Sequence, residues 1–371
     1  MRILFACGGT GGHINPALAV AKEIKRRYPD AEILFIGTKG RMEEKIVPAA
    51  GFEIKAVEMN GLSRKKNLKG VISNIKVLLM AIKASSKAKK IIKDFSPDVA
   101  VGFGGYVSQP VIRAAHKLKV PCCIHEQNAY PGVANKALAK IADKVMLTSQ
   151  EAEKYMKCKY PPVVTGLPVR KEIIMADKKN AREKLGVRDD EILVLSMGGS
   201  LGANIINNSV VEMLESLHDE PKFRFIHATG QFGKWVPDKL KKKSVPFGPG
   251  TNIDLREYID DMEVCMPACD IVISRAGASS VSEISALAKP SIIIPSPNVA
   301  ENHQYHNAMT LAHNGGAILL EEKDIVEGSL TNAVKDLIDN PEKLIEISEK
   351  ARENSKTDAL DNICKVILSF T

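Results

Sequence analysis

The chain opens with MRILFACGGTGGHINP, residues 1–16, and this stretch decides which kind of fold to expect. Arg2–Phe5 is a short apolar run of the kind found in buried strands, and it leads directly into four glycines between residues 8 and 12. Asn15–Pro16 then has the composition of a helix start, a capping residue followed by a proline in the first turn. A strand, a glycine loop and a helix start in this order predict an α/β unit whose backbone amides approach a polar ligand.

Further apolar runs of strand length follow, with helical patterns between most of them. The first series comprises Glu32–Ile36, Asp98–Phe103, Val120–Ile124 and Lys144–Leu147. The second comprises Ile192–Met197, Phe223–Ala228, Ile271–Ser274, Ser291–Pro295 and Ala317–Leu320, with a helix at Asn332–Leu337 among them. Strands that alternate with helices form parallel sheets covered by helices on both faces. The sequence therefore predicts an α/β protein of two doubly wound domains.

The boundary between the domains is expected between Tyr160 and Pro168, where prolines and a glycine interrupt the pattern. A chain of 371 residues is too long for one ordinary core and fits two domains of usual size. We therefore expect an N-terminal domain over residues 1–164, a hinge, and a C-terminal domain over residues 165–340.

The overall composition indicates the cellular compartment and the kind of binding partner to expect. The seven cysteines form no CxxC pair and no Cys/His zinc spacing, which favours reduced thiols and predicts no metal site. The N-terminus lacks the pattern of a secretory signal, and no apolar run has the length of a membrane span. We expect a protein that stays inside the cell and meets a membrane only at its surface. The net charge of +8 favours anionic partners, namely phosphates, nucleic acid or acidic lipid.

Two later loops resemble the first one, because each follows an expected strand and is rich in small residues. Gly198–Ala203 follows an expected strand and adds the hydroxyl of Ser200. Arg275–Ser280 follows another strand and opens a helix that carries Glu283 in its first turn. Ser280 and Glu283 have the spacing of a capping box, whereas a functional interpretation has Glu283 accepting hydrogen bonds from ribose hydroxyls. One carboxylate cannot fully serve both purposes, and the sequence leaves the choice open.

The first loop also has competing interpretations. A tight connection between strand and helix accounts for a pair of glycines, but four glycines with Thr10 and a following His13 favour a ligand site. The sequence GGTGGH does not match the dinucleotide pattern GxGxxG, and no acid follows at the place that binds ribose. A dehydrogenase is therefore a weak alternative.

Arg170 comes directly after the expected hinge, in the segment GLPVR at residues 166–170. From this position a guanidinium can reach a phosphate, although an exposed and solvated arginine is the default for one residue alone. The sequence has no DxD metal motif, and Asp260–Asp261 fits a turn or a helix start. We therefore expect Arg170 and helix dipoles, without a metal ion, to stabilise charge on a leaving diphosphate.

A basic block lies between Met59 and Lys93, where the sequence contains ten lysines or arginines and no acid. Within it Ile72, Ile75, Leu79 and Ile82 recur at helical spacing next to Lys76 and Lys83. This pattern fits an amphipathic helix lying on an anionic membrane, with Ile75, Lys76, Leu79, Ile82 and Lys83 facing the lipid. A core-facing helix with a solvated basic face explains the stripe equally well. Nucleic acid is disfavoured because the block lacks interleaved aromatic residues and a binding motif.

Taken together and in order, several motifs make the chain resemble a known family almost over its full length. They are GGTGGH (8–13), FGGY (103–106), HEQN (125–128), GLPVR (166–170), GGSLGA (198–203), YIDDM (258–262), RAGASSVSE (275–283) and ENHQYHNA (301–308). The chain resembles the GT-B glycosyltransferases that transfer N-acetylglucosamine to undecaprenyl-diphospho-muramoylpentapeptide in peptidoglycan synthesis. The resemblance implies two Rossmann-like domains facing across a cleft, with the acceptor in the N-terminal half and UDP-N-acetylglucosamine held mainly by the C-terminal half.

The resemblance also implies roles for single residues. The residues expected to contact the donor, UDP-N-acetylglucosamine, are Thr10, Gly11, Gly12, Asn128, Arg170, Ser200, Ile259, Ala278, Ser279, Ser280, Val281, Ser282, Glu283 and Gln304. Among them, Ile259 would hold uracil through its backbone and Gln304 would read sugar hydroxyls. The chain departs from the family pattern at Leu201, where a polar residue is common, and at Ser280, where threonine is frequent. These departures affect individual contacts and not the expected reaction.

An inverting transfer needs a base for the 4-hydroxyl of the acceptor sugar, lipid I, and stabilisation for the departing UDP. His13 is the first candidate base because imidazole titrates near neutral pH, and the dipole of the helix start favours its neutral form. The alternative is that His13 only orients an acceptor phosphate or caps the helix. Glu126 is the rival base. No cofactor is expected.

The expected product is lipid II, made at the cytoplasmic face of the cell membrane by a peripheral protein. Two other functions keep the same fold. A UDP-sugar transferase acting on diacylglycerol would retain the nucleotide loops and differ in the acceptor surface, and a non-catalytic nucleotide-binding or lipid-surface-binding protein would release no UDP. The resemblance further implies that residues 341–371 pack back on the N-terminal domain.

Overall fold

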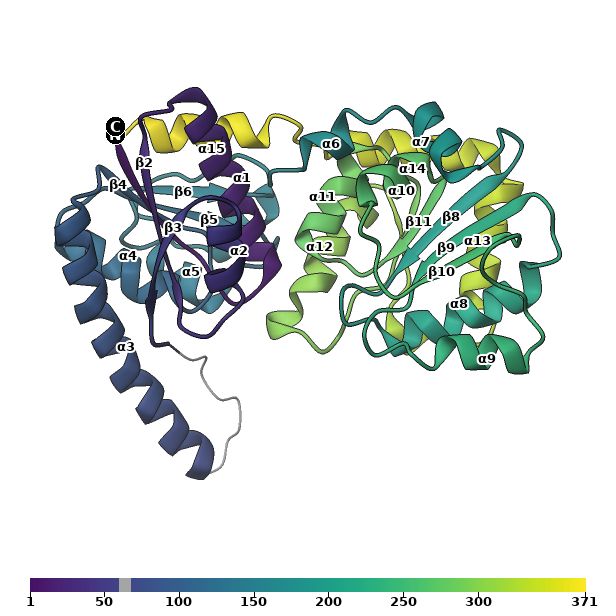
Figure 1. The fold of residues 1–371 in the computed structure, drawn as a ribbon, viewed down its shortest axis with the longest axis horizontal. Coiled ribbons are helices and arrows are strands. Elements are labelled where there is room, and N and C mark those ends of the chain that lie inside the picture. The colour runs from purple at the N-terminus through teal and green to yellow at the C-terminus, as the bar shows by residue number, and fades with distance from the viewer. Residues whose placement is uncertain (60–67) are drawn as a thin grey trace. The chain divides into compact units, whose positions relative to one another are not determined.

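The computed structural model describes residues 1–59 and 68–371, and within the helix that follows residue 67 it does not describe the side chains of residues 68–76, 78 and 79. The described residues form two compact units (Figure 1). Unit 1 contains Met1–Pro168 together with Asp358–Thr371, and unit 2 contains Val169–Thr357. The chain therefore leaves unit 1 at Pro168 and returns to it at Asp358.

Unit 1 is built on a parallel sheet of seven strands in the order β3-β2-β1-β4-β5-β6-β7. Its strands are β1 (Arg2–Ala6), β2 (Glu32–Thr38), β3 (Glu53–Val57), β4 (Val99–Gly102), β5 (Cys122–Glu126), β6 (Lys144–Leu147) and β7 (Val163–Val164). Its helices are α1 (Gly11–Arg27), α2 (Glu43–Ala49), α3 (Leu68–Phe95), α4 (Ser108–Lys117), α5 (Val133–Leu138), η1 (Gln150–Tyr155) and α15 (Ala359–Leu368).

Unit 2 repeats the design with six parallel strands in the order β10-β9-β8-β11-β12-β13. Its strands are β8 (Ile192–Met197), β9 (Phe223–Ala228), β10 (Ile253–Arg256), β11 (Ile271–Ser274), β12 (Ser291–Ile293) and β13 (Ile318–Leu319). Its helices are α6 (Lys171–Ile174), α7 (Lys178–Leu185), α8 (Asn204–Leu217), α9 (Val236–Lys242), α10 (Met262–Ala268), α11 (Ala278–Ala286), η2 (Ala300–Asn302), α12 (His303–Ala312), η3 (Glu322–Asp324), α13 (Ser329–Asp339) and α14 (Pro341–Glu353). The predicted pair of parallel α/β domains is confirmed.

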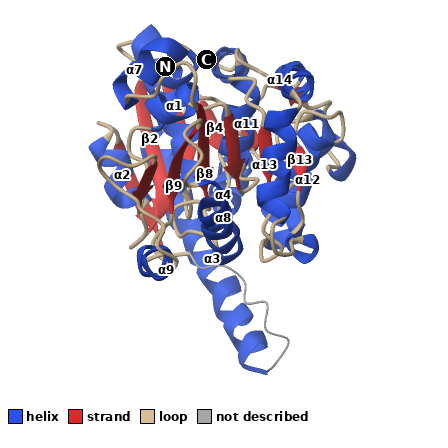
Figure 2. Ribbon diagram, turned by 90° about the vertical axis from the view of Figure 1, so that its right-hand side faces the viewer, coloured by secondary structure: helices blue, strands red, loops and turns tan. Residues whose placement is uncertain are grey.

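Each sheet is buried on both faces, which explains why its central strands are apolar throughout. In β1, Leu4 and Ala6 belong to the core on one face, whereas Ile3 and Phe5 belong to the core on the other. The same alternation occurs in β8 of unit 2. Helices accordingly cover both faces of the strands, which appear red between blue helices in Figure 2. Such sheets place their functional loops at the carboxyl ends of the strands.

The first helix begins earlier than the sequence indicates. Thr10 is the N-cap of α1, and the amides of His13 and Ile14 both bond the carbonyl of Thr10, at 3.1 and 3.2 Å. The expectation that Asn15–Pro16 starts the helix is wrong, because the chain already turns at Gly9, whose φ is +87°. Pro16 instead lies inside the helix, where its missing N–H leaves the carbonyl of Gly12 without an intrahelical donor.

The C-terminal segment is divided between the two units. Helix α14 stays in unit 2, where the hydroxyl of Ser285 donates to the carbonyl of Ala351 at 2.8 Å. Helix α15 lies against α1 in unit 1 and buries Ile363 and Ile367 in its core. Arg27 of α1 also pairs with Asp361 of α15. Residues 341–371 therefore do not return to unit 1 as one segment, because the packing of α14 keeps the first part in unit 2.

Candidate functional site

The glycine loop after β1 is held in place by a buried carboxylate. Glu43 of α2 is fully buried and accepts hydrogen bonds from the amide of Gly9 at 3.2 Å and from the amide of Thr38 at 2.9 Å. A Cβ on Gly8 would lie 2.3 Å from Oε1 of Glu43, so any larger residue would have to displace this carboxylate from its bonds to the loop. The sequence gives no indication of this role for Glu43. The role arises because α2 brings the carboxylate to the ends of two neighbouring strands, β1 and β2.

A second glycine pair, Gly104–Gly105, follows β4 and packs against the first loop. Both residues have positive φ, +97° and +81°, which favours glycine. A Cβ on Gly105 would lie 2.3 Å from the carbonyl oxygen of Gly8, so the two loops touch backbone to backbone. Ser108 fixes the turn, because its hydroxyl lies 2.9 Å from the carbonyl oxygen of Ala6 and accepts from the amide of Gly104 at 3.1 Å.

The backbone contact between Gly105 and Gly8 should contribute to the free energy of unfolding. Gly105→Ala is expected to reduce the free energy of unfolding by about 3 kcal/mol, because it adds backbone strain and a clash with a main-chain atom. Gly40→Ala is the matched control, since Gly40 also has positive φ, +72°, but has open space around it. Gly40→Ala should reduce the free energy of unfolding by about 1 kcal/mol. Urea unfolding of both variants measures the difference, and equal losses would show that the two loops do not pack tightly.

His13 lies in the first turn of α1, where the loop positions its ring. Its Nδ1 is 3.0 Å from the carbonyl oxygen of Gly8 and 3.2 Å from the hydroxyl of Thr10. A carbonyl oxygen only accepts, so the neutral ring that donates to Gly8 carries its hydrogen on Nδ1. The lone pair then lies on Nε2. This is the tautomer in which Nε2 can take a proton from a substrate.

Glu126 ends β5 and lies among hydrogen-bond donors. Oε1 accepts from the amide of Asn128 at 2.9 Å and from its side chain at 3.2 Å, and Oε2 accepts from the amide of Gly132 at 3.1 Å and from Nδ2 of Asn135 at 2.8 Å. Burial raises the pKa of Glu126, and these four bonds oppose the rise. The arrangement suits a carboxylate that organises residues 126–135. It also ties Asn128, a residue expected at the donor sugar, to the end of β5.

In unit 2 the loop after β8 is supported by a neighbouring turn. A Cβ on Gly202 would lie 2.2 Å from the carbonyl oxygen of Thr229, and the amide of Phe232 donates to the carbonyl of Leu201 at 2.9 Å. Asn207 of α8 adds a bond from Nδ2 to the carbonyl of Thr229 at 2.9 Å. Ser200 remains exposed at the tip of this loop. The loop therefore presents its hydroxyl and amides from a rigid support.

Glu283 of α11 does not form the capping box that its spacing allows. The N-cap is Gly277, so Ser280 already lies inside the helix and makes no cap bond. Instead Oε1 of Glu283 accepts from Nε and Nη2 of Arg170, each at 3.3 Å. Burial raises the pKa of Glu283, and the positive charge of Arg170 opposes the rise. The structure thus brings two of the predicted donor-binding residues together.

The other predicted residues of unit 2 lie around the same end of the sheet. Ala278, Ser279, Ser280, Val281 and Ser282 form the first turns of α11, after β11. Oε1 of Gln304, in α12, accepts from the amide of Ser296 at 2.8 Å, and Asn307 of the same helix bonds the carbonyl of Ala276 at 3.1 Å. The side chain of Ile259 is buried in the core, which leaves its backbone as the part able to meet a ligand.

Sheet order explains why these loops gather. In unit 1 the loops with His13, Gly104 and Glu126 follow β1, β4 and β5, which are neighbours in the sheet. In unit 2 the loops with Ser200 and Ala278 follow the neighbouring strands β8 and β11. In each unit the strand order reverses between the first two of these strands, and ligands of open α/β sheets bind at that point. Each unit therefore has one candidate site within its own fold.

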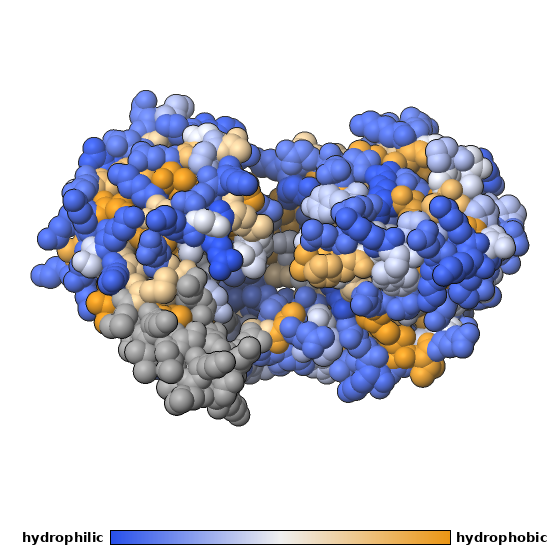
Figure 3. Space-filling view, turned by 60° about the horizontal axis from the view of Figure 1, so that its bottom comes forward, coloured by the Kyte–Doolittle hydropathy of each residue, from blue (hydrophilic) through white to orange (hydrophobic). Residues whose placement is uncertain are grey.

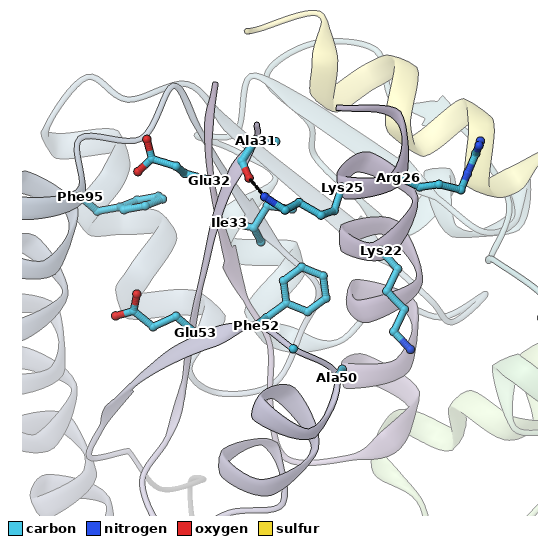
Figure 4. A pocket seen from close by; sticks show the side chains of 11 residues that line it. Lys22, Lys25, Arg26, Ala31, Glu32, Ile33, Ala50, Phe52, Glu53 and Phe95 are labelled. Atoms are coloured by element: carbon cyan, nitrogen blue, oxygen red, sulfur yellow. Dashed lines mark hydrogen bonds between the residues drawn. The ribbon is translucent and has the colours of Figure 1, made fainter. Parts of the chain in front are cut away.

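Two cavities of unit 1 lie at the opposite end of the sheet. One, of about 560 Å³, is lined by the first residues of β2 and β3, Glu32 and Glu53, and by Lys22, Lys25 and Phe52 (Figure 4). Lys25 is occupied there by a hydrogen bond from Nζ to the carbonyl of Ala31 at 2.8 Å (Figure 4).

The other cavity, of about 880 Å³, is lined by residues that include Lys144, Val163 and Phe370. Lys144 and Val163 begin β6 and β7, so this cavity also faces the amino ends of strands. Neither cavity contains a predicted site residue.

Within residues 1–59 and 68–371, no group of three or more His, Cys, Asp or Glu side chains is arranged to hold a metal ion. Over the same residues, no helix is both long enough and apolar enough to cross a membrane.

Comparison with known proteins gives matches along the whole chain. Residues 3–147 match the glycosyltransferase family 28 N-terminal domain, and residues 193–363 match the glycosyltransferase family 28 C-terminal domain. A protein of Acetivibrio thermocellus named UDP-N-acetylglucosamine--N-acetylmuramyl-(pentapeptide) pyrophosphoryl-undecaprenol N-acetylglucosamine transferase is 42% identical over 99% of this chain and 97% of its own length. A protein of the same name from Caldanaerobacter subterraneus is 41% identical over the full length of both.

Solved structures agree with these matches. The crystal structure of Acinetobacter baumannii MurG has a TM-score of 0.78 and 27% identity, and the match covers 99% of each chain. A Staphylococcus aureus MnaA-UDP co-structure has a TM-score of 0.69 and 16% identity, covering 100% of this chain and 98% of the other. At that identity the second likeness concerns the fold alone.

Proposed function

The chain belongs to glycosyltransferase family 28, and from this membership and the two loop-lined sites we propose that it transfers N-acetylglucosamine from UDP-N-acetylglucosamine to the muramoyl sugar of lipid I. The observation that carries the proposal is identity of about 40%, over the whole chain, to enzymes named for this transfer. The enzyme is an N-acetylglucosaminyltransferase of peptidoglycan synthesis. The transfer inverts the anomeric carbon and uses the 4-hydroxyl of the acceptor, forming lipid II.

Unit 2 holds the donor in this proposal. The amides of the loop at Ser200 and of the first turn of α11 face the diphosphate, because helix starts offer unpaired N–H groups and partial positive charge. Arg170, now paired with Glu283, turns to the diphosphate when UDP-N-acetylglucosamine binds, and Glu283 then accepts bonds from the ribose hydroxyls. The support for this exchange is the long Arg170–Glu283 contact at 3.3 Å, made by a half-exposed guanidinium.

Unit 1 holds the acceptor and the base. Nε2 of His13 takes the proton of the 4-hydroxyl while the acceptor oxygen attacks the anomeric carbon, and the bond to UDP breaks with its electron pair. Thr10, Gly11 and Gly12 contribute amides and a hydroxyl beside the reacting sugar. Glu126 holds Asn128 and Asn135 in place, and its saturated carboxylate is less suited than His13 to accept the proton.

The experiment that tests the function measures UDP release with alternative acceptors. The protein is incubated with UDP-N-acetylglucosamine and a lipid I analogue, diacylglycerol or no acceptor. Release with the lipid I analogue alone supports the proposal. Release with diacylglycerol would make the chain a related lipid glycosyltransferase, and no release with any acceptor would make it a binding protein.

We also propose that α3 contacts the anionic cytoplasmic face of the membrane. Val77, Ala84, Ala88 and Ile91 form the buried stripe of this helix, whereas Ile82 is 61% exposed and Lys83 is exposed. The side chains of Ile75, Lys76 and Leu79, also expected to face lipid, lie outside the described residues. The helix extends well beyond the rest of unit 1 in Figures 1 and 2. On the face shown in Figure 3, most of the described surface is hydrophilic, with scattered hydrophobic patches. The exposed lysines of the described part of α3, among them Lys83 and Lys87, supply positive charge that would attract an anionic membrane.

Membrane contact predicts a specific loss of binding. Replacing Lys83 and Lys87 together by glutamate reverses two exposed charges on α3 and is expected to weaken binding to anionic vesicles about 100-fold. Loss of the two lysines removes roughly 1 kcal/mol each, and repulsion of the new carboxylates by the surface adds to the loss. Lys241→Glu with Lys242→Glu, exposed on α9 of unit 2, is the matched control and should bind as the parent does. Vesicle cosedimentation at low and high salt measures both. Equal binding by the two double variants would contradict membrane contact through α3.

A further inference from the structure

Gln127 follows the candidate site residue Glu126 and lies under the loop that holds His13. Its side chain is buried, with 3% of its surface exposed. Nε2 donates to the carbonyl of Phe103 at 2.9 Å and to the carbonyl of His125 at 3.2 Å, and it lies 3.1 Å from Nδ1 of His125. Gln127 therefore links the end of β5 to the strand that precedes Gly104.

His125 fixes which way the amide of Gln127 points. His125 is fully buried, and its Nε2 lies 2.9 Å from the carbonyl oxygen of Gly166, so this nitrogen carries the ring hydrogen. Burial lowers the pKa of His125 to about 4, which keeps the ring neutral at neutral pH. Nδ1 is then an acceptor. One hydrogen on Nε2 of Gln127 goes to the carbonyl of Phe103, and the carbonyl and Nδ1 of His125 share the other. The ring of Phe103 stacks on His125 at 5.3 Å and limits its rotation.

The oxygen of the same amide consequently points away from His125. Oε1 of Gln127 is buried and has no hydrogen-bond partner, which is rare for a polar atom in a protein interior. A Cβ built on Gly104 would lie 3.3 Å from this oxygen and 2.9 Å from Nε2 of His13. Both atoms therefore border the same small space above Gly104, which a glycine keeps open.

We propose that Gln127 is a positioning residue for His13: its Oε1 accepts a hydrogen bond from Nε2–H of His13 once His13 has taken the proton of the acceptor hydroxyl. The proposal rests on the role of His13 in the proposed function. In the reaction the hydroxyl O–H bond breaks, its proton moves to Nε2, the oxygen bonds the anomeric carbon, and UDP leaves with the electron pair. The imidazolium then donates from Nδ1 to the carbonyl of Gly8 and from Nε2 to Gln127.

The other titratable groups around the loop are neutral or already engaged, so none of them is proposed as the acceptor for Nε2–H of His13. Cys7, which follows β1, is neutral because burial raises the pKa of its thiol far above neutral. Glu43 of α2 approaches the loop at Gly8 and Gly9 and is engaged with backbone amides. Glu126 of β5 is engaged by Asn128 and Asn135, and His125 is neutral. Oε1 of Gln127, by contrast, has no hydrogen-bond partner and borders the same space as Nε2 of His13.

The test measures the pKa of the His13 ring. Gln127→Met keeps the side-chain volume and removes the acceptor oxygen, so the pKa of His13, followed by NMR of histidine-labelled protein without substrate, should fall by about one pH unit. The value of kcat should fall about tenfold, with KM for UDP-N-acetylglucosamine within about twofold of the parent. His13→Gln assigns the resonance. Ser291→Ala, which removes a buried unpartnered hydroxyl in unit 2, is the control and should change none of these values.

Gln127→Glu keeps an acceptor oxygen at the same place, so the pKa of His13 should stay at or above the parent value. An unchanged pKa in Gln127→Met, or a lowered pKa in both variants, overturns the proposal. A lowered pKa in Gln127→Met with undiminished kcat also overturns it, and in addition removes His13 from its role as base. Loss of kcat with an unchanged pKa overturns the positioning role and leaves the function of the enzyme intact.

Discussion

Replacing His13 by alanine is expected to lower kcat about 1,000-fold while UDP binds as tightly as before. The expected loss is of the size that a positioned general base contributes, about 100- to 10,000-fold. His13 has the geometry for that role, since its Nδ1 is held by the carbonyl of Gly8 at 3.0 Å and leaves the lone pair on Nε2. The nucleotide loops belong to unit 2, so UDP affinity measured by calorimetry should change by less than about twofold, because no UDP contact is removed.

His116→Ala is the control for this experiment, because His116 is an exposed histidine of α4 in the same unit and borders the cavity at the opposite end of the sheet. It should keep the parent kcat. If His13→Ala turned over at a rate near that of the parent, His13 would be a helix-start residue and the base would have to be sought elsewhere. Glu126 would then be the next residue to replace.

Replacing Arg170 by alanine should lower kcat by about 100- to 1,000-fold, the range seen when a group that stabilises a developing negative charge is removed. In the structure Arg170 pairs with Glu283, so its removal also leaves a partly buried carboxylate without this partner and should raise the pKa of Glu283 further. Affinity for UDP should therefore fall together with kcat. Steady-state kinetics and calorimetry with UDP measure the two effects.

Two further variants sharpen this prediction. Arg170→Lys keeps the charge but not the paired N–H groups, so it should recover only part of the lost rate. Arg188→Ala removes an exposed arginine of unit 2 that pairs with Asp190, and it should behave as the parent does. If Arg170→Ala kept the parent kcat, charge on the departing diphosphate would have to be stabilised by helix dipoles alone.

The sequence predicts the centre of each sheet better than its edges. β6, β8, β9 and β11 have the predicted bounds, because strands buried on both faces are continuous apolar runs. The sequence does not indicate β3, β7 and β10, which are three of the four edge strands. It does indicate the fourth, β13, as a longer strand over Ala317–Leu320. β3 alternates exposed and partly buried residues, and β7 has only two residues, so neither has the composition on which a prediction depends.

Among the candidate site residues, those in local sequence patterns could be predicted and those that depend on distant contacts could not. The glycine loops and His13 stand out because glycine patterns are local in sequence. The roles of Glu43, Ser108 and Gln127 depend on contacts with Gly9, Ala6 and Phe103, which are distant in the chain, and no local pattern predicts them. The capping box of Ser280 and Glu283 was a local interpretation that a tertiary contact, the pair with Arg170, replaces. The start of α1 was misplaced for the same kind of reason, because the turn at Gly9 precedes the proline.

The chemical structure of the lipid product distinguishes the proposed reaction from every alternative transfer. The protein is incubated with UDP-N-acetylglucosamine and a lipid I analogue, and the lipid product is analysed by mass and by NMR of its anomeric proton. The expected product carries one added N-acetylglucosamine in a β-linkage to the 4-position of the muramoyl sugar, with one UDP released per product. An α-linkage, a different position, or recovery of the unmodified analogue would contradict the proposed reaction.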